Sequence, residues 1–451
     1  MKKSDFDAGE VQGLLASGYA KHTAACFVLL RILNGQAARE WLGRIAAQIT
    51  YCGNRQAVSK LNIAFSYAAL GKLGCSPEEL DGFSREFCEG MVTPHRQRIL
   101  GDLPGGPNDP ETWQWGGPRN PPIDVLLMVY ELTPAALQTR LDGIRSGAEG
   151  VEIIQEHRST GLQNNREHFG FRDGIAQPTI EGIGKPGPAR DRVARGEFIL
   201  GHPDETGSLE LAPAMALNGS YVVLRQILQD VPGFWESLGQ DSPVAERIAL
   251  AAKIVGRWPD GTPLTLSPEP PVAANPTNDF AFHAKDREGL RCPFGAHIRR
   301  ANPRDTLLDH PAASMEMINR HRLLRRGRSF GLPAPPSTYP EGLAVKAMEG
   351  VMGSTDLRGL FFICLNASLA RQFEFVQQNW VNLPKFDDLT HDTDPLVGAT
   401  PWAGPGQSPE FMIQGCPVSK RVSRPQTYVH TIGGAYFFLP GKKTLQRLAG
   451  T

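Results

Sequence analysis

The segment from Arg291 to Asp305 combines residue types that could hold an iron-containing cofactor. It reads RCPFGAHIRRANPRD, so a single histidine, His297, lies among four arginines in a backbone restricted by prolines and a glycine. A neutral imidazole is a good iron ligand, and a guanidinium is a good partner for a carboxylate or phosphate. Haem needs both, because its iron needs a ligand and its propionates need countercharges. Without further evidence, a structural histidine is the more ordinary interpretation.

Two other segments carry groups that could act on a ligand of that iron. Residues 167–178 read EHFGFRDGIAQP and place Asp173 inside a Gly-x-x-Asp-Gly turn. Residues 325–331 read RRGRSFG and begin 28 positions after His297. A carboxylate can move a proton and a guanidinium can stabilise a developing negative charge. An aspartate before glycine, however, more often stabilises its own turn.

Together, these three segments resemble the dye-decolorising peroxidases, a family of haem enzymes in which the same segments occur in the same order. Further similar pieces run from residues 11–13 to residues 436–438, so the resemblance covers nearly the whole chain. It implies an α+β fold of two ferredoxin-like domains with antiparallel sheets, of the dimeric α/β barrel type. It also implies a non-covalent haem b, held mainly by the C-terminal domain.

The resemblance assigns roles to the charged residues of these segments. His297 is expected to ligate the iron, and Asp173 is expected to be the proton shuttle on the opposite face. Arg325 matches the arginine that polarises peroxide, although its neighbour Arg326 is the main alternative. Arg304 resembles a propionate contact.

Other residues are expected around the cofactor on the same basis. Gly174 and Ile175 follow the aspartate of the turn, while Leu360 and Phe362 lie two apart on a predicted strand and resemble the apolar wall of the pocket. An iron-bound histidine usually donates its other N–H to an acidic or carbonyl group. Asp394 is the first candidate for that acceptor, with three aspartates nearby as alternatives: Asp387, Asp388 and Asp392.

Bulky donors cannot reach a buried haem, and relatives are thought to relay the oxidising equivalent through surface aromatic residues. Trp380 and Tyr339 are the candidates here, although packing is the more ordinary role for both.

The composition excludes some classes of partner. Lysine plus arginine and aspartate plus glutamate both number 47, so zero net charge gives no reason to expect a nucleic-acid or anionic-membrane partner. The N-terminus lacks the apolar stretch of a signal peptide, and the seven cysteines are scattered without a Cys-x-x-Cys pair. We therefore expect a cytoplasmic protein, and the sequence leaves a homo-oligomer open.

Apolar runs predict two similar halves, 1–215 with the loop that carries Asp173 and 216–451 with the haem. Strands are predicted over 24–33, 61–66, 123–130 and 151–157 in the first half, and over 220–228, 359–366 and 434–439 in the second. Thr133 and Pro134 predict the start of a helix that ends near Ser146. Pro259 to Asp286 is predicted to be an irregular insertion that covers a cofactor edge.

The expected function is a haem peroxidase that uses hydrogen peroxide to oxidise aromatic, dye-like or other organic donors. The alternative is a haem carrier or iron-releasing protein, similar to a deferrochelatase, with little peroxidase turnover. Intact Asp173 and Arg325 favour the enzyme, since a carrier needs neither.

Overall fold

The structure is a computed structural model that describes residues 6–53, 58–159, 165–332, 357–399, 410–423 and 427–450. Its first half forms a four-stranded antiparallel sheet in the order β4-β1-β3-β2. The elements are β1 (Ala24–Ile32), α1 (Gly35–Ala46), β2 (Lys60–Phe65), β3 (Val125–Glu131), α6 (Pro134–Ser146) and β4 (Val151–Ser159). Four short helices connect β2 to β3: α2 (Tyr67–Lys72), α3 (Pro77–Leu80), α4 (Arg85–Glu89) and α5 (Pro94–Leu100).

The second half repeats this strand order as β13-β7-β10-β8. Its strands are β7 (Ser220–Gln229), β8 (Leu324–Arg325), β9 (Arg328–Phe330), β10 (Gly359–Asn366) and β13 (Val429–Leu439), and β9 pairs with β10 beyond β8. The two sheets join where Phe65 of β2 pairs with Phe438 of β13. Two α+β units with antiparallel strands in the same order confirm the predicted fold class.

The strands β1, β3, β7 and β10 are largely apolar because both of their faces are buried. In β1, Cys26, Val28 and Leu30 pack on one side, toward the helices, and Phe27 and Leu29 pack on the other. This alternation follows from the two-residue period of a strand. The side chains of Phe27 and Phe361 meet between the two sheets at a ring distance of 5.1 Å, so this inner layer belongs to both halves.

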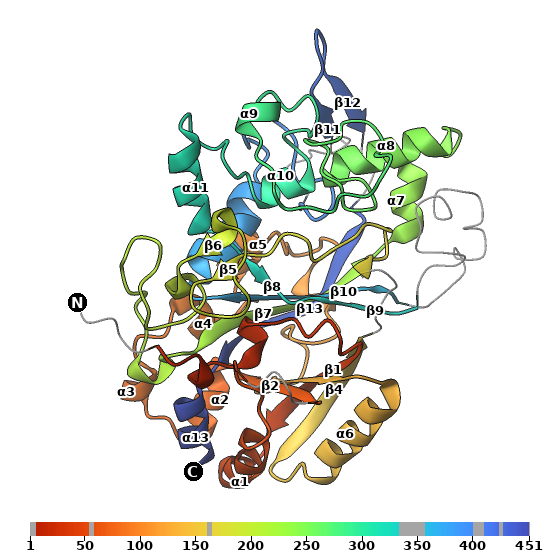
Figure 1. Cartoon of the computed structure of the whole chain (residues 1–451). Helices are drawn as coiled ribbons and strands as arrows, with labels where there is room; N and C mark the ends of the chain where they lie inside the picture. The colour runs from red at the N-terminus through yellow and green to blue at the C-terminus, as the bar shows by residue number, and fades with distance from the viewer. Residues whose placement is uncertain are drawn as a thin grey trace.

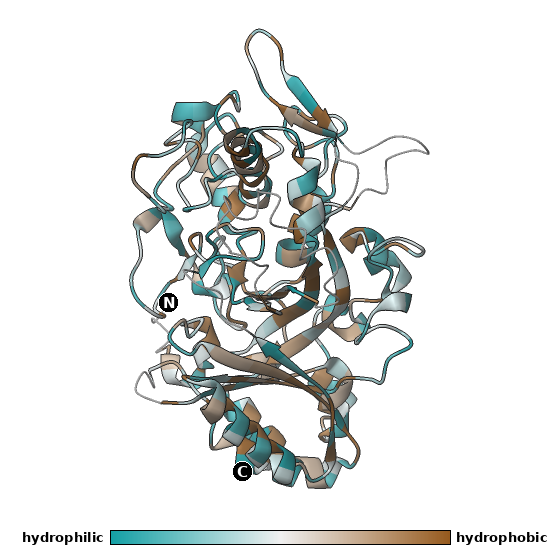
Figure 2. Ribbon diagram, turned by 90° about the vertical axis from the view of Figure 1, so that its right-hand side faces the viewer, coloured by the Kyte–Doolittle hydropathy of each residue, from teal (hydrophilic) through white to brown (hydrophobic). Residues whose placement is uncertain are grey.

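Figure 1 shows these layers, with the two sheets stacked near the centre and α1 and α6 below β1 and β4. The last helix, α13 (Lys442–Ala449), crosses from the second half to pack on α1. In Figure 2 the strands of both sheets are largely brown, in keeping with their double burial. The start of α6 is as predicted, since the Thr133 side chain accepts a hydrogen bond from the Ala136 N–H.

The upper part of Figure 1 contains segments that lie between β7 and β8 in the sequence and others that lie between β10 and β13. They include α7 (Val231–Ser237), α8 (Val244–Val255), α9 (His283–Asp286), α10 (His297–Ala301), α11 (Pro311–Asn319) and the hairpin β11 (Glu410–Ile413) and β12 (Lys420–Ser423). The helix after β10 is wide, with π-helical turns η9 (Ala370–Glu374) and η10 (Val376–Val381). Within the described ranges, no helix combines the length and the hydropathy needed to cross a membrane.

Candidate active site

His297 is the first residue of the short helix α10, and the next turn of this helix is fixed by two buried arginines. Arg299 donates to the main-chain oxygens of Asp286, Cys292 and Arg287 and lies 4.6 Å from the ring centroids of both Phe282 and Phe294. Arg300 donates to the carbonyl oxygens of Trp380, Leu383 and Asp392. Two of the four arginines that accompany the histidine therefore hold the backbone in place.

The imidazole of His297 is paired with one of the four candidate aspartates. Its Nδ1 lies 2.8 Å from Oδ2 of Asp394. A carboxylate that is ionised can only accept, so Nδ1 carries the proton and Nε2 is the ring nitrogen with a lone pair. Burial acts to lower the pKa of His297, but the Asp394 charge and hydrogen bond raise it above its usual value.

Asp394 is well suited to remain ionised at this position. Its Oδ1 accepts the N–H groups of Leu396 and Val397 at 2.9 and 3.0 Å, and its own N–H donates to the Val381 carbonyl oxygen. Burial alone would raise the pKa of its carboxyl, yet His297 and these amides hold that pKa below its ordinary value. Fixed in this way, Asp394 sets the orientation and tautomer of the ring.

Asp173 faces Arg325 across the site. Arg325 Nη1 lies 3.1 Å from Asp173 Oδ1, and the main-chain N–H of Arg325 donates to Gln177 Oε1 at 3.0 Å. Gly174 adopts φ +77°, a left-handed conformation that glycine takes at little cost, and its N–H donates to the carboxylate of Asp173. The turn residues after the aspartate therefore help to hold its charge.

The pKa of Asp173 lies below its ordinary value although burial acts in the opposite direction. Arg325 and the Gly174 N–H act against the effect of burial, and His297 adds to them when its ring is protonated. The carboxyl is therefore ionised and able to take up a proton over most of the pH range.

The turn that carries Asp173 is held by an adjacent carboxyl. Glu167 accepts the N–H groups of Phe169 and Phe171 at 2.9 and 2.8 Å and the side-chain amide of Gln229 at 2.6 Å. No arginine or lysine pairs with Glu167 among the described contacts, and burial raises the pKa of its carboxyl to about 7. Glu167 was not among the site residues predicted from the sequence.

The structure distinguishes Arg325 from Arg326 as the arginine that contacts Asp173, a choice that the sequence left open. Arg326 points away from Asp173 and donates to the carbonyl oxygens of Leu14 and Leu15 at 2.7 and 2.8 Å. Arg328 likewise donates to Gly18 and Tyr19. These two arginines fasten the N-terminal segment to the second sheet, while Arg325 is the one that meets the aspartate.

Asp173, Arg325 and His297 lie close enough for their charges to act on one another. The pKa of His297 responds to both of the other groups, and that of Asp173 responds to both as well. Their side chains are 47%, 32% and 30% exposed, whereas Asp394 is completely buried. The three groups therefore remain accessible to a ligand, while the residue that orients the histidine does not.

Buried arginines form a second feature of the site. Arg304, Arg257 and Arg322 are each about 5% to 6% exposed. Burial and the neighbouring arginines lower the pKa of Arg304 to about 9, and Asp191 is the acidic group that acts against this. Arg304 also donates to the Asn278 and Phe280 carbonyl oxygens. The insertion over residues 259–286 thus contacts this positively charged region, and its role in covering a cofactor edge stays a prediction.

Leu360 and Phe362 lie on the face of β10 that points away from the inner layer between the sheets. Their neighbours Phe361 and Ile363 are fully packed in that layer, whereas Leu360 and Phe362 are only partly buried. Phe362 contacts the Phe373 ring at 5.9 Å. Ile175 lies beside Gly261, at the start of the insertion.

Trp380, one of the two candidates for a surface relay, instead has the packing role that was the more ordinary interpretation. Trp380 is 5% exposed and packs edge-on against Phe375 and His321 at ring distances of 5.4 and 5.3 Å. It belongs to an apolar cluster with Phe294 and Leu389, because the helix that carries it packs over α10. Tyr339 lies outside the described residues.

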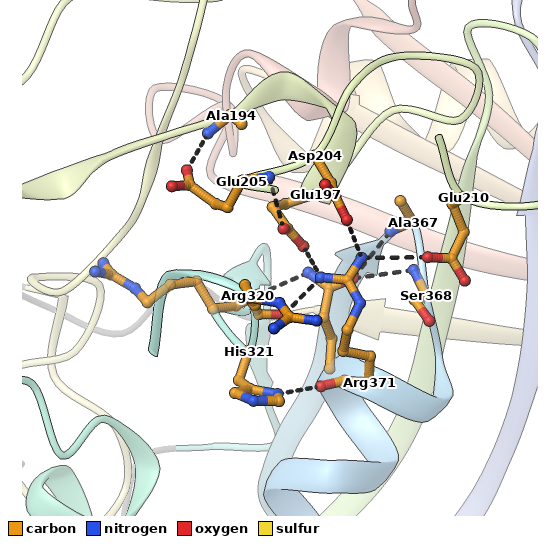
Figure 3. Close-up of polar contacts among 12 residues, drawn as sticks. Ala194, Glu197, Asp204, Glu205, Glu210, Arg320, His321, Ala367, Ser368 and Arg371 are labelled. Atoms are coloured by element: carbon orange, nitrogen blue, oxygen red, sulfur yellow. Dashed lines mark hydrogen bonds and ion pairs between the residues drawn. The ribbon is translucent and has the colours of Figure 1, made fainter. Parts of the chain in front are cut away.

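An ion-pair network fixes the chain just before Arg322 and Arg325 (Figure 3). Arg371 contacts the carboxylates of Glu197, Glu210 and Asp204 at 2.5, 3.2 and 3.6 Å. It also donates to the Arg320 carbonyl oxygen, and its own carbonyl oxygen is 2.5 Å from His321 Nδ1. The network connects the segment that carries Arg322 and Arg325 to the helix after β10, and it was not predicted from the sequence.

Comparisons with known proteins identify the family. No family model matches the chain. The dye-decolorizing peroxidase of Mycena epipterygia is 30% identical over 87% of this chain and 77% of that relative. The multifunctional dye peroxidase DyP2 of an Amycolatopsis species is 31% identical over 75% of this chain and 74% of its own length. The chain belongs to the dye-decolorizing peroxidase family.

Solved structures agree with this assignment. A dye-decolorizing peroxidase in complex with 2,6-dimethoxyphenol has a TM-score of 0.82 at 24% identity and covers 98% of this chain and 100% of its own. That likeness shows the shared fold. The family assignment made from the sequence is confirmed, and with it the class of enzyme, since members of this family are haem oxidoreductases that act on hydrogen peroxide.

Proposed function

We propose that this protein is a haem b peroxidase in which Asp173 and Arg325 act on hydrogen peroxide and His297 ligates the iron. Two side-chain contacts support the proposal: Asp173 lies 3.1 Å from Arg325, and His297 lies 2.8 Å from Asp394. The two contacts belong to one site, because the charges of Asp173 and Arg325 act on the pKa of His297. One pair contains an ionised base and a donor, and the other contains a ligand with its orienting acceptor.

The residues fit a haem on two counts. The accessible imidazole presents Nε2, because Nδ1 is committed to Asp394. The buried guanidinium groups of Arg304, Arg257 and Arg322 exceed the charge of Asp191, so two propionates would supply the missing countercharge. Leu360, Phe362 and Ile175 would supply apolar contacts for the porphyrin. Bound haem would supply the iron at which the O–O bond is cleaved.

The chain's own residues would handle the protons and charge of that reaction. Asp173 is ionised, so its carboxylate can remove a proton from one peroxide oxygen and return it to the other as water leaves. Arg325 holds Asp173 in place and can donate to the oxygen on which negative charge develops. Gly174 and Gln177 help to position these two residues, since the Gly174 N–H donates to the Asp173 carboxylate and the Arg325 main-chain N–H donates to Gln177.

Most of the proposed haem contacts fall in the second half of the chain. His297, Arg304, Arg325 and Asp394 lie beyond residue 215, and the turn with Asp173 approaches from the first half. This distribution supports a division into 1–215 and 216–451, with the haem mainly in the second domain. Aromatic and dye-like compounds are the proposed donors, in line with the names of the relatives.

A haem carrier or iron-releasing protein is the alternative, and the site argues against it. A carrier needs an iron ligand and propionate partners but no base held ionised by an arginine. We would load the purified chain with hemin, add hydrogen peroxide and an aromatic donor, and follow both donor oxidation and the haem spectrum. Many donor turnovers per haem support the peroxidase. Slow bleaching with metal-free porphyrin as the product would overturn the proposal in favour of the carrier.

A further inference from the structure

A hollow of about 210 Å³ lies between the β11–β12 hairpin and the segments that carry the His297–Asp394 pair. One wall is Phe294, three residues before His297. Another wall is the run 388–392, which ends two residues before Asp394. The hollow is therefore lined by the segments that lead directly into His297 and Asp394, and the function proposed above gives it no role.

The floor of the hollow is apolar and rigidly held. Phe294, Leu389 and Met412 contribute to it, and all three belong to the apolar cluster that contains Trp380. The Phe294 N–H donates to Gln414 Oε1 at 3.0 Å, and the Met412 N–H donates to Asp392 Oδ2 at 2.6 Å. An aromatic ring on this floor would contact the same cluster that packs against α10.

The rim of the hollow is negatively charged. Asp388 and Glu410 line it together with one arginine, Arg421, while Asp392 is 3% exposed and lies in the wall beneath the rim. That arginine is already paired with Glu410 at 3.2 Å. No arginine or lysine of the described chain lies within ion-pair distance of Asp388, which is exposed at the edge. The rim would therefore favour a cation and disfavour an anion.

We propose that this hollow binds aromatic electron donors that carry a positive charge, such as phenols with an ammonium group. This inference rests on the proposed peroxidase function. The ring would lie on the apolar floor, the ammonium group would face Asp388, and the hydroxyl would lie within the polar part of the wall. Anionic phenols of the same size would be excluded by charge.

The donor reaction is a one-electron oxidation. Each phenol loses its hydroxyl proton and one electron and becomes a phenoxyl radical, while the enzyme that peroxide has oxidised gains the electron. Two phenols are consumed for each hydrogen peroxide, and the two protons and two electrons complete the reduction of peroxide to two waters. The hydroxyl proton passes to solvent at the open rim of the hollow, which His391 lines.

The test compares tyramine, a cationic phenol, with 4-hydroxyphenylacetate, an anionic one, in the haem-loaded full chain. We expect kcat/KM to favour tyramine and Asp388→Asn to reduce that preference about threefold, the size of an exposed charge interaction. Asp388→Lys should reverse the effect, lowering kcat/KM for tyramine while raising it for 4-hydroxyphenylacetate. Raising the salt concentration should shrink the wild-type preference. The control is Asp241→Asn, an exposed aspartate away from the hollow.

Binding is measured separately, by saturation-transfer NMR of tyramine with the full chain in the absence of peroxide. A tyramine signal that Asp388→Lys removes supports the site, even if the wild type turns over neither phenol and the peroxidase proposal fails. If Asp388→Lys changes both phenols by the same factor, or if tyramine gives no transfer signal with the wild type, the inference is overturned.

Discussion

Replacing Asp173 by asparagine removes the ability of this side chain to take up a proton and keeps its position in the site. An asparagine keeps an oxygen that can accept from Arg325, at the 3.1 Å separation seen for Oδ1, and its main-chain N–H still donates to Asn165 at 2.8 Å. What it loses is the ability to take a proton. A positioned general base contributes about 10²- to 10⁴-fold in rate, which corresponds to about 3 to 5 kcal/mol of barrier.

The assay is stopped-flow mixing of the haem-loaded protein with excess hydrogen peroxide, which gives the second-order rate constant of the first absorbance change. We expect Asp173→Asn to lower that constant by at least about a hundredfold while the resting haem spectrum is retained. Asp309→Asn is the matched control, because Asp309 also pairs with an arginine, Arg287 at 3.3 Å, but is 92% exposed at the surface. A rate constant for Asp173→Asn within about threefold of wild type would refute the role of Asp173 as a general base, because loss of such a base should lower the rate constant far more.

Three other perturbations separate the remaining roles. Arg325→Leu should slow the peroxide reaction and move the acid limb of its pH profile upward, because the pKa of Asp173 rises without the guanidinium; Arg326→Leu should lower Tm and leave that limb in place. Arg304→Gln should speed haem loss to a scavenger such as apomyoglobin, while unchanged loss would contradict its propionate role. Burial raises the pKa of Glu167 from 4.5 to about 7, so its contribution to stability is complete below pH 4.5 and is lost as the pH rises through 7. Relative to Glu167→Gln, the wild type should therefore lose about 3 kcal/mol of unfolding free energy between pH 4.5 and 8; parallel pH curves for the two proteins would show otherwise.

The elements that sequence predicts well are those whose signals are local. β1, β7 and β10 are apolar runs buried on both faces, and the start of α6 is fixed by the capping of Thr133. The short strands β8 and β9 were not predicted, because each is two or three residues long and rich in arginine. These residues form strands because they pair with β10, which lies about thirty residues further along the chain, and such a distant pairing leaves no local signal in the sequence.

The same reason limits what sequence can say about the site. Arg325 and Arg326 are chemically equivalent in a sequence, but Arg325 ends β8 and Arg326 directly follows it, and their side chains point in opposite directions, one toward Asp173 and one toward Leu14. Asp394 was one of four nearby aspartates, and only the packing of its loop beside α10 distinguishes it. For Trp380 the sequence left a surface relay open beside packing, because solvent exposure depends on which helices pack over a residue.

The most direct test of the central claim is a hemin titration of the purified chain followed by absorption spectroscopy. We expect the wild type to bind one hemin with a Soret band typical of histidine ligation, His310→Ala to behave identically, and His297→Gly to lose that spectrum and regain it when imidazole is added. His297→Gly binding hemin with the wild-type spectrum and affinity in the absence of imidazole would contradict the claim.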